Sequence, residues 1–99
     1  DERKIAGLRP KHHSPKASVK IVEPVEEVEA DAAFIGISAP GVEFAFMKIV
    51  ADARGYAHEL FEFFRECDRR GIRTIYCQTV AETGIGGALM DRIRRAAQG

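Results

Sequence analysis

The chain has 99 residues, of which 45% are apolar and 30% charged, and its 15 basic residues balance its 15 acidic residues. This length and composition are typical of a single soluble globular domain with one modest core. No apolar run approaches the roughly 20 residues that cross a bilayer, and no secretory signal is visible, so we expect neither a membrane span nor export.

The neutral total conceals a segregation of charge along the chain. Residues 1–20 contain six Lys or Arg and two acids, a net charge of +4, whereas residues 21–31 contain five acids and no base, a net charge of −5. The rest contains nine bases and eight acids. A nucleic-acid-binding domain is normally basic over a folded face as well, so this distribution does not favour a strong nucleic-acid binder.

The first half of the chain predicts an arm and three strands. Residues 1–18 contain Gly and Pro without periodicity and predict an extended arm. Residues 18–22 (SVKIV) predict a strand, followed by an acidic, solvated stretch, and the apolar run 33–38 predicts a second strand. Residues 43–50 predict a third. Its alternation places Phe44, Phe46 and Lys48 on one face and Ala45, Met47 and Ile49 on the other.

The second half changes to a helical period. Apolar residues between Asp52, a predicted N-cap, and Gly71, a predicted C-terminal stop, fall on one helical stripe. That stripe consists of Tyr56, Leu60, Phe63, Phe64 and Cys67. Residues 73–80 predict a fourth strand. A glycine-marked turn then leads into a last helix with an apolar seam of Leu89, Ile93, Ala96 and Ala97, and with Arg92, Arg94 and Arg95 largely outside it.

The element order β-β-β-α-β-α predicts an α/β fold. The strand–helix–strand unit at 44–78 favours a right-handed crossover and parallel strands. We therefore expect a small Rossmann-like domain of two or three layers, with about four mainly parallel strands and two main helices. The arm would occupy residues 1–18 and the domain residues 19–99.

Metal and nucleophile chemistry find little support in the sequence. Adjacent histidines in an extended arm, His12 and His13, point in opposite directions and lack nearby carboxylates or thiols at usable spacing. Cys67 and Cys77 form no CxxC pattern and are interpreted as small buried apolar residues in a reducing compartment, which indicates the cytoplasm. Asp68 and Asp91 are interpreted as exposed helix charges, and the aromatic residues as core. No residue is predicted to be catalytic.

The glycine-rich turn leaves two interpretations open. Thr83, Gly84, Gly86 and Gly87 lie between a strand and a helix, where such loops bind phosphate at a helix N-terminus. The turn is not GxGxxG and has no P-loop lysine, and glycine also allows a helix to pack closely against a strand. The alternatives are therefore close packing and an anion or nucleotide site.

Two stretches resemble one family. Residues 7–19 (GLRPKHHSPKASV) are similar to the interdomain linker motif of two-domain threonylcarbamoyl-AMP synthases. Residues 56–97 resemble the end of the same proteins' C-terminal domain, with its glycine loop and final helix. The linker matches are Gly7, Lys11, His12, Pro15, Lys16, Ala17 and Val19, and the later matches are Gly84, Gly86, Ala88, Asp91, Arg92, Ala96 and Ala97. The chain departs from the motif at Pro10 and His13, where the family usually has tyrosines, and at Ser18, where it has proline.

The resemblance implies an accessory domain of an enzyme. These enzymes make threonylcarbamoyl-AMP and pyrophosphate from threonine, bicarbonate and ATP, for N6-threonylcarbamoyladenosine at position 37 of tRNA. The chemistry, with ATP and Mg, belongs to an N-terminal YrdC-type domain, which this chain lacks, so no cofactor is expected here. The first residue, Asp1 rather than Met, fits a piece of a longer protein. Gly7, Lys11, His12, His13, Pro15 and Lys16 would then form a strap over the active site of that domain.

Two further hypotheses remain beside the resemblance. One is a free-standing module that binds a phosphate-bearing metabolite at the glycine turn. The other is an accessory domain that contacts tRNA through the arm and Arg92, Arg94 and Arg95. Otherwise we expect the tRNA-modification machinery to be only an indirect partner and expect no membrane partner.

Overall fold

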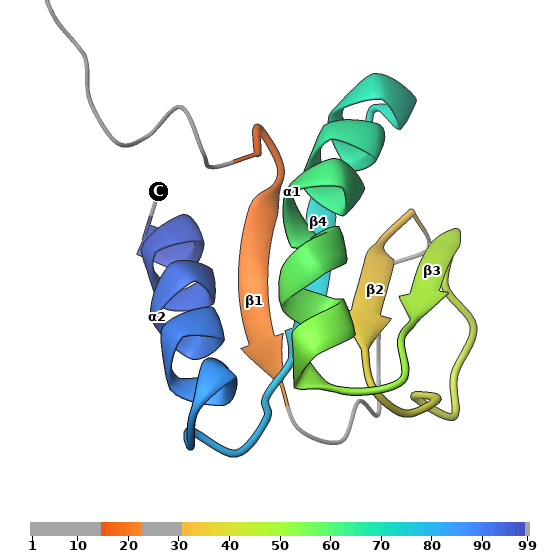
Figure 1. Ribbon diagram of the computed structural model, residues 1–99. Helices are drawn as coiled ribbons and strands as arrows, with labels where there is room; N and C mark the ends of the chain where they lie inside the picture. The colour runs from red at the N-terminus through yellow and green to blue at the C-terminus, as the bar shows by residue number, and fades with distance from the viewer. Residues whose placement is uncertain (1–14, 23–30, 99) are drawn as a thin grey trace, which may run out of the picture.

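A computed structural model describes residues 15–22 and 31–98 of the chain. Within these residues the elements are β1 (Ser18–Val22), β2 (Ala33–Gly36), β3 (Phe46–Ile49), α1 (Ala53–Arg70), β4 (Thr74–Gln78) and α2 (Ile85–Gln98) (Figure 1). The predicted order of elements is confirmed, although β2, β3 and β4 are each shorter than the sequence pattern predicts.

The four strands form one parallel sheet in the order β1-β4-β2-β3. β4, the last strand in the chain, lies between β1 and β2, so that Ile75 is in register with Val19 on one side and with Ala33 on the other. The predicted strand–helix–strand unit is present as β3-α1-β4, and its crossover passes over β2. The α/β fold class is therefore confirmed, with a sheet that is parallel throughout its described strands.

Helix α1 begins and ends where the sequence predicts. The Asp52 carboxylate accepts a hydrogen bond from the Gly55 amide at 2.9 Å and so caps the first turn. Gly71 ends the helix in the left-handed conformation (φ 73°), which its lack of a Cβ permits, and Arg69 and Arg70 complement the negative end of the helix dipole. All five residues of the predicted apolar stripe are buried.

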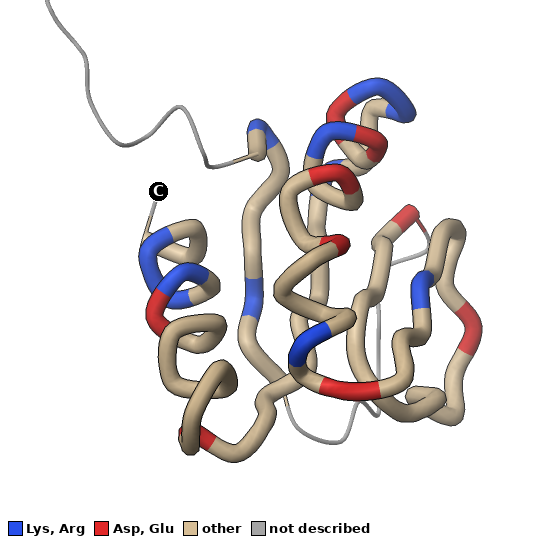
Figure 2. The backbone as a smooth tube through the Cα atoms, in the orientation of Figure 1, with Lys and Arg blue, Asp and Glu red and all other residues tan. Residues whose placement is uncertain are grey.

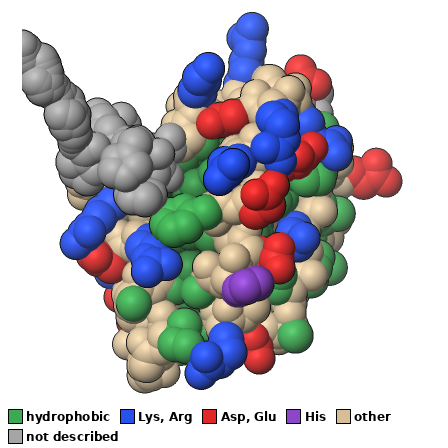
Figure 3. Space-filling view, turned by 45° about the horizontal axis from the view of Figure 1, so that its top comes forward, with side chains coloured by type: hydrophobic (Ala, Val, Ile, Leu, Met, Phe, Trp, Pro, Cys, Tyr) green, Lys and Arg blue, Asp and Glu red, His purple; other side chains and the backbone are tan. Residues whose placement is uncertain are grey.

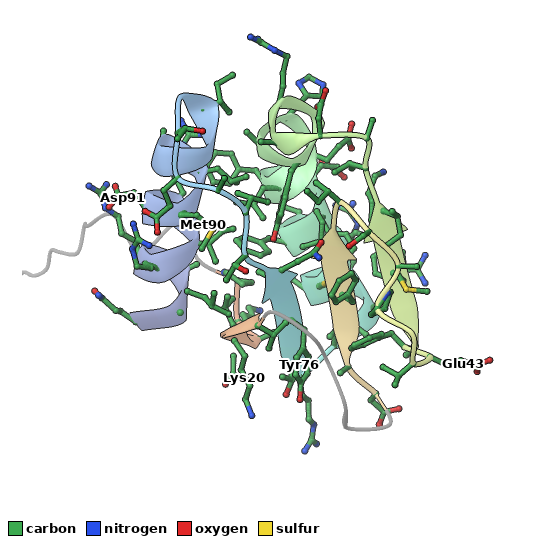
Figure 4. All side chains as sticks on the ribbon, turned by 90° about the horizontal axis from the view of Figure 1, so that it is seen from below. Lys20, Glu43, Tyr76, Met90 and Asp91 are labelled. Atoms are coloured by element: carbon green, nitrogen blue, oxygen red, sulfur yellow. The ribbon has the colours of Figure 1, made fainter. Side chains whose placement is uncertain are left out.

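Both helices lie on one face of the sheet, as Figure 4 shows from below. The main core lies between them and the inward residues of the strands, among them Val19, Ile35 and Ile75. The nine-residue connection between β2 and β3 (37–45) instead passes over the opposite face, where Phe44 packs near Phe34 and Tyr76. The β2–β3 and β3–β4 crossovers run in opposite directions along the sheet, and right-handed connections then belong on opposite faces.

Three predicted placements of side chains are wrong. Phe44 does not share a face with Phe46: it belongs to the connection before β3, whereas Phe46 stacks on Phe63 of α1 with ring centroids 5.0 Å apart. Phe61 was expected in the core but is 37% exposed, because it lies off the buried stripe of α1. Ala97 is exposed, while Met90 takes part in the buried seam of α2.

Candidate functional site

Residues 15–18, the part of the arm that the structure describes, are attached to the domain by hydrogen bonds and by burial of one side chain. The Lys16 amide donates a hydrogen bond to Asp68 Oδ1 at 2.9 Å, and the Ser18 amide donates to the Arg73 carbonyl at 2.9 Å. Between them Ala17 is buried in the main core. Pro15 is half-buried and Lys16 is exposed. Gly7, Lys11, His12 and His13 lie outside the described residues.

The arm enters at the amino ends of the strands, beside the last turns of α1 (Figure 1). Charged side chains crowd this end of the molecule (Figure 3). Arg69 contacts both Glu62 and Glu66, at 2.7 and 2.6 Å, and Arg70 contacts Glu66 at 2.8 Å. Hydrogen bonds from the two guanidinium groups lower the pKa of the Glu66 carboxyl. These arginines therefore already have anionic partners within the domain.

The glycine turn lies at the opposite end of the sheet, where the strands terminate (Figure 1). Gly84 has a positive φ of 56°, and a Cβ at Gly86 would overlap the carbonyl oxygen of Ala81. The amides of Gly86 and Gly87 donate to the carbonyls of Thr83 and Gly84 at 3.0 and 3.2 Å. Glycine at 86 thus lets the start of α2 lie against residues 80–81 of the segment that follows β4. The structure does not bring this turn together with residues 15–18, the part of the arm that it describes.

A hollow of about 550 Å³ opens beside the glycine turn. It is lined by Ile21 of β1, residues 79–82 after β4, and Met90 and Arg94 of α2. Glu82 and Arg94 form a two-pronged ion pair at its rim, with distances of 3.0 and 3.1 Å. The hydrogen bonds of this pair lower the pKa of Glu82 and raise that of Arg94. We refer to this feature as the β1–α2 hollow.

The two cysteines are buried and free, as predicted. Burial raises the pKa of Cys67 and of Cys77 to about 12 in each case, so both thiols are protonated at neutral pH. Tyr56 donates a hydrogen bond to the Gln78 carbonyl at 2.8 Å, and burial raises its pKa strongly, followed in size by the effect of Cys77. These groups have the chemistry of a packed core rather than of a nucleophile.

The charged residues of α2 that the sequence analysis considered contact other side chains of the domain. Asp91 pairs with Arg95 at 3.0 Å, one turn along α2, and Arg92 lies over the ring of Phe61 at 5.5 Å from its centroid. The three arginines of α2 thus all contact side chains of the same domain. Figure 2 shows acidic and basic residues interspersed along α1, whereas α2 carries one acidic residue beside its three arginines. Among the described residues, no three His, Cys, Asp or Glu side chains are grouped so as to hold a metal ion.

The sequence did not predict a polar cluster at the centre of the sheet's carboxyl edge. Gln78 Oε1 accepts hydrogen bonds from the amides of Ile37 and Ser38, at 2.7 and 3.2 Å, and Gln78 Nε2 donates to Ser38 Oγ at 2.8 Å. Gly36 makes this approach possible, because a Cβ there would meet the Gln78 Cβ at 2.7 Å. In the sequence, the feature that could have indicated this cluster is Gly36, a glycine within an apolar run.

The described helices include none that is both long and apolar enough to cross a membrane. These observations define the class of protein as a small parallel α/β domain with an extended segment, residues 15–18, attached at the amino ends of its strands.

The comparisons with known proteins agree with this architecture. Residues 1–98 match the family described as the C-terminal domain of threonylcarbamoyl-AMP synthase, and the chain belongs to this family. A threonylcarbamoyl-AMP synthase of Pyrococcus abyssi (strain GE5 / Orsay) is 29% identical over 110 residues. The match covers 97% of this chain but 32% of that protein, so the chain spans about a third of the relative's length.

Two solved structures have the same fold. The crystal structure of P. abyssi Sua5 complexed with L-threonine superposes with a TM-score of 0.75 at 25% identity, over 93% of this chain and 31% of that one. A P. abyssi Sua5 variant, with a histidine and the adjacent tyrosine replaced by alanine, gives a TM-score of 0.70 at 25% identity, over 85% of this chain and 28% of that one. The resemblance inferred from the two sequence motifs is thereby confirmed.

Proposed function

We propose that this chain is the C-terminal accessory part of a threonylcarbamoyl-AMP synthase and that its arm covers the active site of a preceding catalytic domain. That domain would use Mg and would convert threonine, bicarbonate and ATP into threonylcarbamoyl-AMP and pyrophosphate. The product would serve tRNA modification in the cytoplasm. The chain itself would supply no catalytic group. Membership of the family and the match to about a third of the relative's length support this division of labour.

The single observation that carries the proposal is the attachment of the arm at Lys16. The amide of Lys16 is held by Asp68, and burial of Ala17 fixes the next residue, so the arm leaves the domain from a defined point. An extended chain advances at most about 3.5 Å per residue. Lys11 and His12 would therefore act within roughly 20 Å of this point. The mouth of the catalytic pocket should face the amino edge of the sheet.

Restricting the origin of the arm has an energetic consequence. A segment held at one end samples a smaller volume than a free one, so less entropy is lost when its other end closes over a pocket. Lys11, His12 and Lys16 carry donors suited to phosphate oxygens of ATP or pyrophosphate. The domain would thus serve as the fixed support for a basic strap.

The test uses the longer synthase and measures pyrophosphate release. Deletion from residue 7 onward should remove most of the activity, and the double variant Lys11→Ala/His12→Ala should lower the rate with the fold intact. Asp68→Ala should raise KM for ATP more than it lowers kcat, because the catalytic groups remain while the strap loses its anchor. Asp91→Ala, which breaks an exposed pair on α2, is the matched control and should leave both constants unchanged. Unchanged turnover after the deletion would refute the covering role.

A tRNA-contacting role is the weaker alternative. Arg92, Arg94 and Arg95 each contact a side chain of their own domain, and phosphate binding would have to compete with those contacts. Contact with tRNA phosphates would weaken steeply with salt. Salt-dependent binding of tRNA by the chain, lost on substitution of these arginines, would favour this alternative over the strap.

A further inference from the structure

We propose that the β1–α2 hollow binds an α-amino acid with an aliphatic side chain. This inference does not depend on the proposed function, since it concerns residues at the opposite end of the sheet from the point where Lys16 attaches the arm (Figure 1). The chemistry of the lining residues defines the ligand class.

The location of the hollow is the usual one for a ligand site in an α/β protein. Parallel sheets bind small molecules at the carboxyl ends of their strands, where loops rather than ladders expose polar groups. The hollow lies at this edge, between the end of β1, the segment 79–82 after β4, and α2. The hollow has a volume of about 550 Å³ and is an open depression rather than an enclosed pocket.

The lining of the hollow includes apolar side chains, although slightly more of its surface is polar than apolar. Met90 is only 3% exposed, and its position on α2 is labelled in Figure 4. Ile21 and Val80, which are half-buried, and Ala81 also belong to the apolar part of the lining. Aliphatic carbon placed here would leave water and contact three flexible or branched side chains, which is favourable in proportion to the area buried.

The rim carries one charge of each sign. A simple anion attracted by Arg94 would meet the Glu82 carboxylate about 3 Å away, and a simple cation attracted by Glu82 would meet the guanidinium. A ligand with adjacent carboxylate and ammonium groups satisfies both, the carboxylate receiving hydrogen bonds from Arg94 and the ammonium donating to Glu82. The α-amino acid backbone has this arrangement.

The ion pair also opens at small cost. The side chains of Arg94 and Glu82 are 44% and 52% exposed, and exposed pairs of this kind contribute little to stability. Separating them to admit a zwitterion therefore exchanges two exposed contacts for two similar ones and adds the burial of the aliphatic side chain. The selectivity should come from the apolar part of the lining together with the presence of both charges.

The experiment titrates the 99-residue chain with L-leucine and follows its backbone amides by NMR. We expect saturable shifts confined to residues 79–82 and 90–94, with a millimolar dissociation constant. Isocaproate, which lacks the ammonium group, and isoamylamine, which lacks the carboxylate, should bind about tenfold more weakly. Glycine, which has no side chain for the apolar part of the lining, should bind more weakly as well.

Three variants separate specific binding from general attraction. Arg94→Gln and Glu82→Gln should each weaken leucine binding about tenfold. Arg95→Gln, an adjacent exposed arginine paired with Asp91, is the matched control and should retain the affinity of the unmodified chain. The proposal is overturned if leucine gives no saturable shifts, if isocaproate binds as well as leucine, or if the Arg95 variant loses as much affinity as the Arg94 variant.

Discussion

Replacing Gly86 by alanine should destabilise the domain, although alanine is the better helix former. Gly86 is buried in the first turn of α2, and an ideal Cβ on it would overlap the Ala81 carbonyl oxygen and lie 3.1 Å from the carbonyl carbon. Both obstructing atoms belong to the backbone, so no side-chain rotation can relieve the overlap. The start of α2 would have to move away from residues 80–81.

The expected loss follows from two opposing effects. Forcing an extra carbon into a close-packed contact costs typically about 1–3 kcal/mol, and here the obstacle is rigid, so the upper part of this range applies. Alanine in place of glycine contributes up to about 1 kcal/mol in the other direction through helix propensity. The free energy of unfolding should therefore fall by about 1–2 kcal/mol in Gly86→Ala.

Gly87 provides the matched control. It is the next residue of the same helix, but a Cβ there would find its nearest neighbour, the Glu82 carbonyl oxygen, at the ordinary distance of 3.5 Å. Gly87→Ala should therefore be stabilising by about 0.5–1 kcal/mol. Urea unfolding followed by far-UV circular dichroism measures both variants. Equal or greater stability of Gly86→Ala, or an equal loss in Gly87→Ala, would show that close packing is not the reason for glycine at 86.

Further predictions concern the buried polar groups. Tyr56→Phe removes the hydrogen bond to the Gln78 carbonyl and should lower the free energy of unfolding by about 0.5–1.5 kcal/mol in the same urea assay, with an unchanged result contradicting a role for the hydroxyl. Cys67 and Cys77 should resist a thiol reagent at neutral pH in the folded chain and react once urea unfolds it; fast labelling of the folded chain would contradict their burial. Folding raises the pKa of both thiols and of the Tyr56 hydroxyl. Their contribution to the free energy of unfolding is therefore fully present below the pKa of an exposed thiol, about 8.5, and declines as the pH rises toward 12. Stability measured from pH 7 to 11 should therefore fall, and a rise over this interval would refute the assignment.

The helices were predictable because their determinants are local. The 3.6-residue apolar period, the Asp52 cap and the Gly71 stop all act within a few residues of where they occur, and the structure confirms each of them for α1. The apolar runs likewise predicted where strands exist. Their ends were less predictable, because a strand ends where its neighbour in the sheet ends, and that neighbour is distant in the sequence.

The candidate site was predictable only in part. Family motifs identified the arm and the glycine turn, but not that the described end of the arm and the turn lie at opposite ends of the sheet, since this depends on the direction of every strand. The clamp of Gln78 on Ser38 joins residues 40 positions apart. The β1–α2 hollow combines β1, the segment after β4 and α2. Sequence spacing contains no information on such contacts.

The amino-acid sequence by itself therefore determined the α/β class, the order of elements, the buried face of α1 and the family. Those properties depend on side-chain periodicity, backbone preferences of single residues and short motifs. Only the tertiary structure decided the strand order β1-β4-β2-β3, the position of Phe44 on the second face of the sheet, and the ion pair between Glu82 and Arg94. These outcomes arise from the competition of strands for neighbours and of apolar side chains for one core, which is settled by the chain as a whole.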